Sequence, residues 1–211
     1  MTNLATLLTL SDSRLPTGGH VHSGGVEQAV AEGLIRDLPT LRAFLRRRIR
    51  TNGLMAASIA AAVCNGTLDT SQADRETDAR TPAPAARQAS RAQGRGLVRL
   101  ARRVWPDVEW HRLGTTPHLP VAAGTVGAAS GTTPEHTALS VIYTTMTGSA
   151  TAAQRLLALD PGDVAAVTFE LAPLCDQLAA EAGKELAELS DPLLDVLAQR
   201  HSQRERPLFA S

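Results

Sequence analysis

The clearest periodic pattern in this chain runs from Asp37 to about Val63. Its apolar residues recur mainly at intervals of three, four and seven, which places them on one face of an α-helix, and they are Leu41, Phe44, Leu45, Ile49, Ala56, Ala60 and Val63. Asp37 is suited to cap this helix, and Pro39 in the first turn is typical of a helix start. The other face carries arginines, namely Arg42, Arg46, Arg47 and Arg50. We therefore predict one helix over residues 37–63.

A second helix is predicted from Pro84 to Val104, where small residues dominate the inner stripe. The stripe consists of Ala85, Ala89, Ala92, Gly96, Leu100 and Val104. It is flanked by Arg87, Arg91, Arg95, Arg99, Arg102 and Arg103. Because small side chains let helices approach closely, we expect close packing along this stripe. The polar stretch at 67–82 is predicted to be a surface connection or a short helix.

Prolines that follow capping residues mark the remaining helix starts. We predict helices over about 120–130, from Thr133-Pro134 to about Leu157, from Asp160-Pro161 to about Leu189, and from Ser190-Asp191-Pro192 to near Gln199. Pro173 should kink or split the third of these, since its ring removes a backbone donor. These patterns predict an all-α fold, a single-domain bundle of about eight to ten helices. It would span residues 1–199, with a Gly-rich N-terminal loop and a flexible C-terminal tail at 200–211.

Composition and charge exclude several classes of protein. Ala supplies 35 of the 211 residues, which favours helix. The 21 basic and 21 acidic residues give zero net charge, so the total charge does not attract nucleic acid or an anionic membrane. Lys184 is the single lysine, and no Gly-rich turn precedes it. The chain therefore lacks the P-loop with which GTPases and ATPases hold phosphates.

The cysteines and the N-terminal residues indicate a cytoplasmic protein. Cys64 and Cys175 lie far apart in apolar stretches, which gives no disulfide framework and no CxxC metal site. The first fifteen residues lack a basic start and an A-x-A cleavage signal. The longest uncharged stretches are interrupted by Thr, Ser, Gly and Pro, so we expect no membrane span.

The least helical segment near the N-terminus is residues 12–27, with four glycines that indicate tight turns or close approach of another chain. Its His20 and His22 could form half of a metal site, since imidazole binds zinc, nickel and copper. A surface or packing role is favoured for this pair. The other histidines lack metal-site spacing, and they are His111, His118, His136 and His201.

Catalytic and DNA-binding interpretations find little support in the remaining residues. No Gly-x-Ser-x-Gly elbow presents a serine nucleophile. Glu76 and Asp78 could act as a general acid and base, although their polar surroundings favour ordinary solvated carboxylates. The arginine-rich faces at 42–50 and 87–103 could contact phosphates, but zero net charge favours solvated faces or protein interfaces.

The Gly-rich segment resembles a known family. Residues 15–27 resemble the signature L-P-x-G-G-aromatic-x-x-S-x-G-Leu-E of the urease accessory protein F (UreF) family, through Pro16, Gly18, Gly19, Ser23, Gly25 and Glu27. A short apolar helix, here Leu4 to Leu10, precedes that signature in the family. His20 and His22 stand where the family usually has aromatic residues. The segment H-V-H-S-G-G at residues 20–25 is similar to the corresponding segment of actinobacterial members of the family.

Further motifs follow in the order of the family. Arg87 to Ser90, with Gly94 and Leu97, resembles its R-x-A-S helix, and residues 118–124 resemble its H-x-P-V-x-x-G helix start. Ser190-Asp191-Pro192 resembles the start of its last helix. The terminal Leu208, Phe209, Ala210 and Ser211 resemble its R-L-F-x-S ending, with Pro207 in the place of Arg and Arg206 one residue earlier.

The resemblance implies a non-enzymatic chaperone for insertion of nickel into urease, with no cofactor of its own. It implies a homodimer that binds accessory protein D (also called H), recruits the accessory GTPase G and docks on apo-urease. An all-helical DNA-binding regulator is the alternative, and a metal-dependent hydrolase using His20 and His22 is a third possibility.

Two hypotheses concern the ends of the chain. The tail, whose polar residues end in the apolar pair Leu208-Phe209, should be loose in the free protein and order on the D protein. Ser23 and Glu27 should begin the next helix and hold the Gly-rich loop by a capping arrangement.

Overall fold

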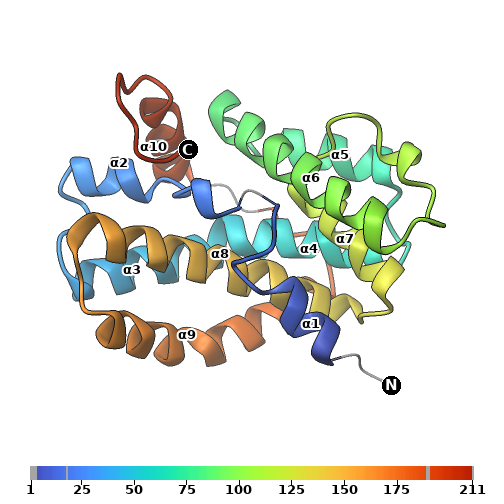
Figure 1. Cartoon of the computed structure of the whole chain (residues 1–211), viewed down its shortest axis with the longest axis horizontal. Helices are drawn as coiled ribbons and strands as arrows, with labels where there is room; N and C mark the ends of the chain where they lie inside the picture. Colours follow the sequence, from blue (N-terminus) through green and yellow to red (C-terminus); the bar gives the residue numbers. More distant parts are fainter. Residues whose placement is uncertain (1–3, 18, 189–190, 211) are drawn as a thin grey trace.

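The computed structural model describes residues 4–17, 19–188 and 191–210, and all regular structure within them is helical (Figure 1). The α-helices are α1 (Leu4–Leu10), α2 (Val26–Ala31), α3 (Leu38–Arg48), α4 (Leu54–Cys64), α5 (Thr70–Ala79), α6 (Pro84–Val104), α7 (Leu119–Ser130), α8 (Pro134–Leu157), α9 (Pro161–Ala182) and α10 (Pro192–His201). Short 3-10 turns cover Gly19–Val21 (η1) and Trp110–Leu113 (η3), and a π-helical segment covers Ile49–Gly53 (η2). The all-α prediction is confirmed.

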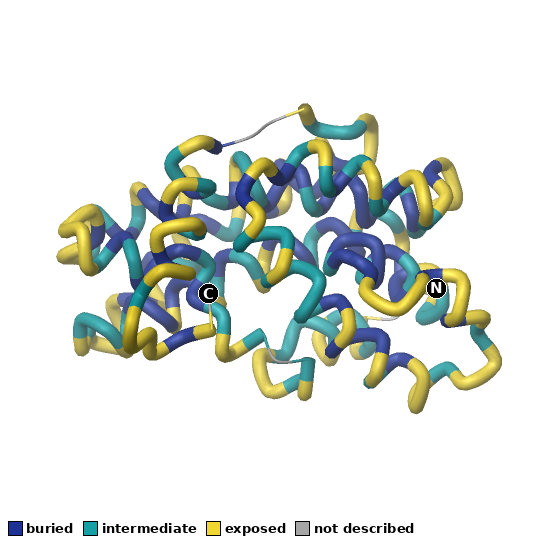
Figure 2. The backbone as a smooth tube through the Cα atoms, turned by 90° about the horizontal axis from the view of Figure 1, so that it is seen from above, coloured by how far each residue is buried: buried dark blue, intermediate teal, exposed yellow. Residues whose placement is uncertain are grey.

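Helix α4 lies at the centre of the molecule and packs against α7, α8 and α9 (Figure 1). Met55 and Ile59 join an apolar cluster with residues of α6 and α7. Leu54 and Ala57 join a larger cluster built from α2, α3, α8, α9 and α10. A helix that is apolar on more than one face is enclosed by its neighbours. Figure 2 shows the same arrangement, with buried positions toward the interior of the molecule and exposed positions on the outward sides of the helices and in the loops.

The helix predicted over 37–63 is present as α3, η2 and α4 in direct succession. Asp37 caps it as expected, because its Oδ1 accepts a hydrogen bond from the Thr40 backbone N–H at 2.9 Å. The Thr40 hydroxyl accepts one from the Asp37 N–H at 3.1 Å, which completes a capping box. The π-helical segment changes the helical phase between α3 and α4. Residue spacing alone did not reveal that change.

Helix α6 has the predicted bounds, but its small-residue stripe is not its buried face. Only Gly96 of the stripe is buried, and the buried positions are Gly94, Gly96, Leu97, Val98 and Ala101. A Cβ added to Gly94 would lie 2.1 Å from the Pro117 carbonyl oxygen, and one added to Gly96 would lie 2.2 Å from the Thr17 carbonyl oxygen. The two glycines thus let the segments that contain Pro117 and Thr17 approach the α6 backbone closely.

Helix α9 shows neither the split at Pro173 nor the end near Leu189 that was predicted for residues 160–189. It runs unbroken through Pro173, which is exposed, so the carbonyl that loses its helical partner lies on the side facing water. The helix ends at Ala182 with Gly183 as its C-cap, earlier than Leu189, which lies with Ser190 outside the described residues.

The other elements agree closely with the predictions. The polar stretch at 67–82 contains α5, capped by Asp69, and helices α1, α7 and α8 begin within one residue of their predicted starts. α10 extends two residues beyond the predicted end, to His201. Within the described part of the chain, no helix is both long and apolar enough to cross a lipid bilayer.

Candidate functional site

One buried carboxylate ties the N-terminal signature to the end of the chain. Glu27 lies in the first turn of α2 and is only 2% exposed. Its carboxylate accepts hydrogen bonds from the backbone N–H groups of Leu208 (2.9 Å) and Phe209 (3.0 Å). It also lies 2.8 Å from Nε2 of His201, which is equally buried. Two segments separated by almost the whole chain therefore meet at one side chain.

These contacts keep Glu27 ionised. Burial favours the neutral acid, but the hydrogen bonds from Leu208, His201 and Phe209 outweigh it and lower the pKa of Glu27 below the ordinary value. Arg204 adds a positive charge, with its Nε 3.6 Å from Glu27 Oε1. A charged acceptor makes stronger hydrogen bonds than a neutral one. The carboxylate therefore acts as an anchor for the tail.

The tail packs on the Gly-rich loop, contrary to the prediction that it is loose in the free protein. The Ala210 N–H donates to the Val21 carbonyl at 2.6 Å. Phe209 is 8% exposed, and the Arg155 guanidinium lies 5.7 Å from its ring centroid. Leu208 is 80% exposed. One residue of the apolar pair is thus buried, and the other faces outward.

The capping hypothesis for Ser23 and Glu27 is correct only in part for the serine, since Gly25 is the N-cap of α2, and it is wrong for the carboxylate. The Ser23 hydroxyl accepts a hydrogen bond from the Glu27 N–H at 3.3 Å, across the start of α2. The Glu27 side chain turns to the tail instead of to the helix start. A Ser followed by a Glu four residues later predicts a local contact, but the backbone partners of the Glu27 carboxylate lie about 180 residues away.

Within the Gly-rich loop, two glycines have backbone conformations that disfavour other residues. Gly24 has φ +64° and Gly25, the N-cap of α2, has φ +88°. The Gly24 carbonyl accepts a 2.5 Å hydrogen bond from Arg48 Nη1, and a Cβ on Gly24 would lie 2.3 Å from Arg48 Nη2. Burial lowers the pKa of Arg48 to about 10. The Arg48 side chain therefore holds the Gly-rich loop in place through the Gly24 carbonyl.

The neighbouring arginine holds the last helix. Arg47 donates two hydrogen bonds to Asp191, at 2.6 and 2.7 Å. Asp191 also caps α10 by accepting from the Leu193 N–H at 3.1 Å. Arg47 and Arg48 thus position α10 and the Gly-rich loop from one end of α3.

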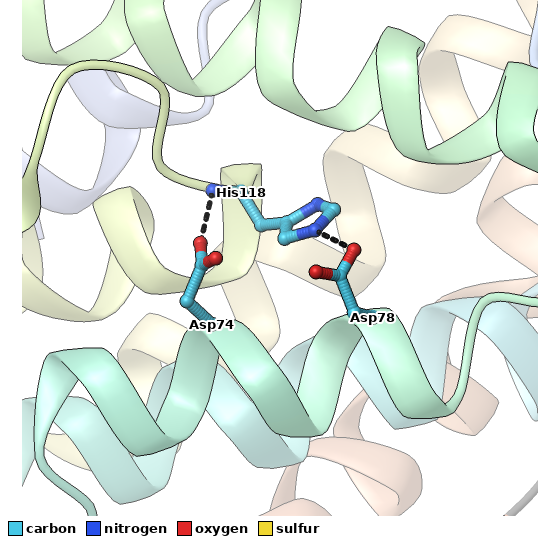
Figure 3. Close-up of side chains that lie close together, drawn as sticks. All are labelled: Asp74, Asp78 and His118. Carbon is cyan, nitrogen blue, oxygen red and sulfur yellow. Dashed lines mark hydrogen bonds and ion pairs between the residues drawn. The ribbon is translucent and has the colours of Figure 1, made fainter.

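A second polar network joins the two internal motifs, as Figure 3 shows in part. His118, fully buried, has its Nε2 2.8 Å from Asp78 Oδ1 and its Nδ1 3.0 Å from the Ser90 hydroxyl. The Ser90 hydroxyl also accepts from the Leu119 N–H at 3.1 Å. The backbone N–H of His118 donates a hydrogen bond to Asp74 Oδ1 at 3.1 Å. The network fastens α5, α6 and the start of α7 together.

Asp74, Asp78 and His118 could in principle hold a metal ion, since each offers a ligand atom within 4.8 Å of the others. Arg91 opposes that use, because its Nη2 donates to Asp74 at 2.9 Å and to Asp78 at 2.8 Å. Both ring nitrogens of His118 also have hydrogen-bond partners. The guanidinium supplies the positive charge that a metal would bring, so the donor set fits a closed ion-pair network.

The remaining predicted residues are dispersed. Arg87 donates to the Thr81 carbonyl at 3.0 Å, next to the network. Pro16 and Arg206 are exposed, Gly19 is half-buried, and Gly18 lies outside the described residues. His20 is exposed and His22 half-buried, and within the described residues neither belongs to a group with metal-ligand geometry. Glu76 and Asp78 each form an ion pair with an arginine, Glu76 with Arg80 and Asp78 with Arg91.

The sequence did not predict the partners of Glu27 or of His118. The spacing of His118 and His201 in the sequence predicts no metal site and no other role, although each is buried beside a carboxylate. The spacing of Asp74 and Asp78 by four residues, with Arg91 on the next helix, was the available signal of an ion-pair network.

These contacts define an all-helical protein whose motif residues fasten loops, helix starts and the C-terminal tail to one another. The sequence model of the UreF family matches residues 35–172. The chain is 75% identical over 214 residues to the urease accessory protein UreF of Mycolicibacterium vanbaalenii, with all of both chains covered. It is 76% and 69% identical over 211 residues to those of Mycobacterium sp. strain JLS and Mycobacterium bovis, again over the full length of each. The chain therefore belongs to the UreF family of urease accessory proteins.

Proposed function

We propose that this protein is a non-catalytic chaperone for the insertion of nickel into urease. As a homodimer in the cytoplasm it would bind accessory protein D (also called H), recruit the accessory GTPase G and present both to the urease apoprotein. The observation that carries this proposal is full-length similarity to proteins named urease accessory protein UreF. The ion pairs of Glu76 and Asp78 with arginines support a non-catalytic role, because they leave neither carboxylate poised for proton transfer.

The tail is the segment that we propose to contact the D protein. The Leu208 side chain is 80% exposed while the backbone N–H groups of Leu208 and Phe209 are held by Glu27, so an apolar side chain is displayed on an ordered backbone. Val21, which accepts a hydrogen bond from the tail, is 40% exposed beside it. Exposed apolar residues on an ordered support suit a protein interface, where a few central side chains carry most of the affinity.

The test is co-purification with the D and G proteins, with and without GTP, followed by urease activation in a strain deleted for this chain. Wild-type protein should capture the D protein, capture the GTPase through it and restore urease activity. Failure of wild-type protein to bind either partner, or normal urease in the deletion strain, would overturn the proposal.

A single substitution tests the role of the tail without disturbing its anchor. Leu208→Asp should lower D-protein binding at least tenfold, since it places a charge in an apolar contact. Leu34→Asp is the matched control, because Leu34 is 43% exposed in the turn that follows α2. Truncation after Gln199 should abolish binding but leave the dimer. Equal D-protein binding by wild type, the Leu208 variant and the truncated chain would show that the tail is not the contact.

The alternative of a DNA-binding regulator receives no support from the comparisons with known proteins. Duplex DNA affinity at about 0.15 M salt is the discriminating measurement, since binding by arginine faces would rest on phosphate contacts. We expect it to be negligible. Metal analysis of the purified protein would likewise test the hydrolase interpretation of His20 and His22.

A further inference from the structure

The arginines of α6 fall into two groups with different surroundings. In the first half of the helix, Arg87 and Arg91 donate to carbonyl groups, and Arg91 pairs with Asp74 and Asp78. The second half of the helix carries four exposed arginines whose side chains make no ion pair or hydrogen bond with other described residues. They are Arg95, Arg99, Arg102 and Arg103. We call these four residues the arginine stripe. They do not contribute to holding the fold through paired contacts.

The arginine stripe occupies one face of the helix. Its members are spaced i, i+4, i+7 and i+8, and at about 100° per residue these positions lie within roughly a quarter to a third of the helix circumference. The stripe covers about 12 Å of helix length. Like charges four residues apart on a helix repel, so the unpaired arginine stripe destabilises the folded chain. The favourable interaction of positive charges with the helix C-terminus offsets this repulsion only in part. Such a cost points to a use outside the folded chain.

The same face continues as a groove toward the N-terminus of α6. A cavity of about 480 Å³ lies there, and Gln88, Ala92 and Arg95 line it from α6. Across the groove stand Ala198 of α10 and Ala210 of the tail. Arg95 belongs both to the stripe and to the groove. The stripe therefore leads directly into the space between α6, α10 and the tail.

We propose that the arginine stripe and this groove form a docking surface for an acidic segment of a partner protein. The inference rests on the proposed adaptor function and adds the chemistry of one partner. Guanidinium groups bind carboxylates in a bidentate fork and are enriched at interfaces, whereas lysine is the usual residue of solvated faces. Three or four carboxylates spread over about 12 Å would match the stripe.

A protein partner fits this surface better than a nucleic acid. Beyond the end of α6 come the exposed acidic residues Asp107 and Glu109, so the positive surface stops there. At the groove end, alanines of α6, α10 and the tail lie beside polar side chains such as Gln88 and Ser202. A short positive surface with a partly apolar groove at one end matches an acidic segment that carries small side chains on one side. It lacks the extended positive track that phosphate backbones require.

The experiment uses Arg99→Glu/Arg102→Glu and a matched control, Arg46→Glu/Arg50→Glu. The control reverses two exposed arginines on α3 and η2 that have no ion pair with other described residues. Each full-length protein is titrated with purified D protein, GTPase G, urease apoprotein and a 20-base-pair DNA duplex, at several salt concentrations. Arg99→Gln/Arg102→Gln serves if charge reversal perturbs folding, which helical circular dichroism would reveal.

We expect the charge-reversed stripe to weaken binding of one of the three proteins at least tenfold, and the neutral variant to weaken it less. The salt dependence of that affinity should become shallower, because charge attraction is the part removed. The control should bind like wild type. Equal binding of all three proteins by stripe variant and control, or loss of DNA binding alone, would overturn this inference and leave the adaptor function standing. Wild-type protein that binds none of the three would overturn both.

Discussion

Replacing Glu27 by Ala is the most direct test of the contact between the two ends of the chain. The change removes the acceptor of hydrogen bonds from Leu208 and Phe209 and the partner of the buried His201. Hydrogen bonds to a charged group contribute about 1.5–3 kcal/mol each. Their full sum is not expected, because the tail can detach and its N–H groups can bind water.

Detachment has its own cost, which sets the expected magnitude. Phe209 would leave its 8%-exposed position, and full burial of such a side chain is worth about 1.5–3 kcal/mol. His201 would also lose its partner. We therefore expect Glu27→Ala to lower the free energy of unfolding by about 3 kcal/mol, and Tm by roughly 6–12 °C for a chain of this size.

The assay combines thermal unfolding by circular dichroism with limited trypsin digestion. Release of the tail should accelerate cleavage after Arg204, read by mass spectrometry of the C-terminal peptide. Glu32→Ala is the control, because Glu32 is exposed at the C-cap of the same helix and pairs with Arg200 at the surface, where ion pairs contribute little. A Glu27→Ala protein that melts and digests like Glu32→Ala would refute the anchoring role.

A pH series gives the same anchor an independent test. The pKa of Glu27 is lower in the folded protein than the ordinary 4.5, so its contribution is complete above that pH and is lost as the pH falls below it. The stability difference between wild type and Glu27→Ala should therefore shrink on acidification below about pH 4.5. A difference that stays constant down to pH 3 would contradict the assignment.

Three further predictions concern the rest of the framework. Gly96→Ala should destabilise the fold by about 1–3 kcal/mol in urea unfolding, since its Cβ would meet the Thr17 carbonyl, and a neutral result would mean that the loop yields easily. Burial lowers the pKa of His118, so the unfolded chain takes up the proton first and stability should fall as the pH drops below 6.5. His118→Gln should lack that part of the pH dependence, and an identical pH profile would count against it. Asp191→Ala should lower the free energy of unfolding by about 1–2 kcal/mol through loss of the α10 cap and the Arg47 pair, with unchanged Tm as the contrary outcome.

The helix starts were predictable because their signals are local. Asp37, Asp69, Thr133 and Asp160 each accept a hydrogen bond from an N–H within three residues, and proline follows within two residues of three of them. Such short-range contacts are encoded in adjacent residues. The end of α9 was less predictable, since Ala, Leu and Glu would continue a helix past Gly183 without penalty.

The buried faces and the polar partners could not be derived in the same way. The spacing along α6 permitted both the small-residue stripe and the face of Leu97 and Ala101, and long-range packing decided between them. Glu27 with Phe209, and His118 with Asp78, are contacts across 182 and 40 residues. Nothing adjacent in sequence specifies them. The family motifs indicated which residues mattered, and the folded chain indicates which residues they touch.

The two-sided burial of α4 affects how loss-of-function variants should be interpreted. Because α4 contributes to both apolar clusters, neither cluster can open without exposing one of its faces to water. Its amide hydrogens should therefore exchange only through global unfolding, whereas α1, which has no buried residue, should exchange by local opening. A substitution in α4 that abolishes urease maturation would then report the amount of folded protein in the cell. It would say nothing about which surface a partner recognises.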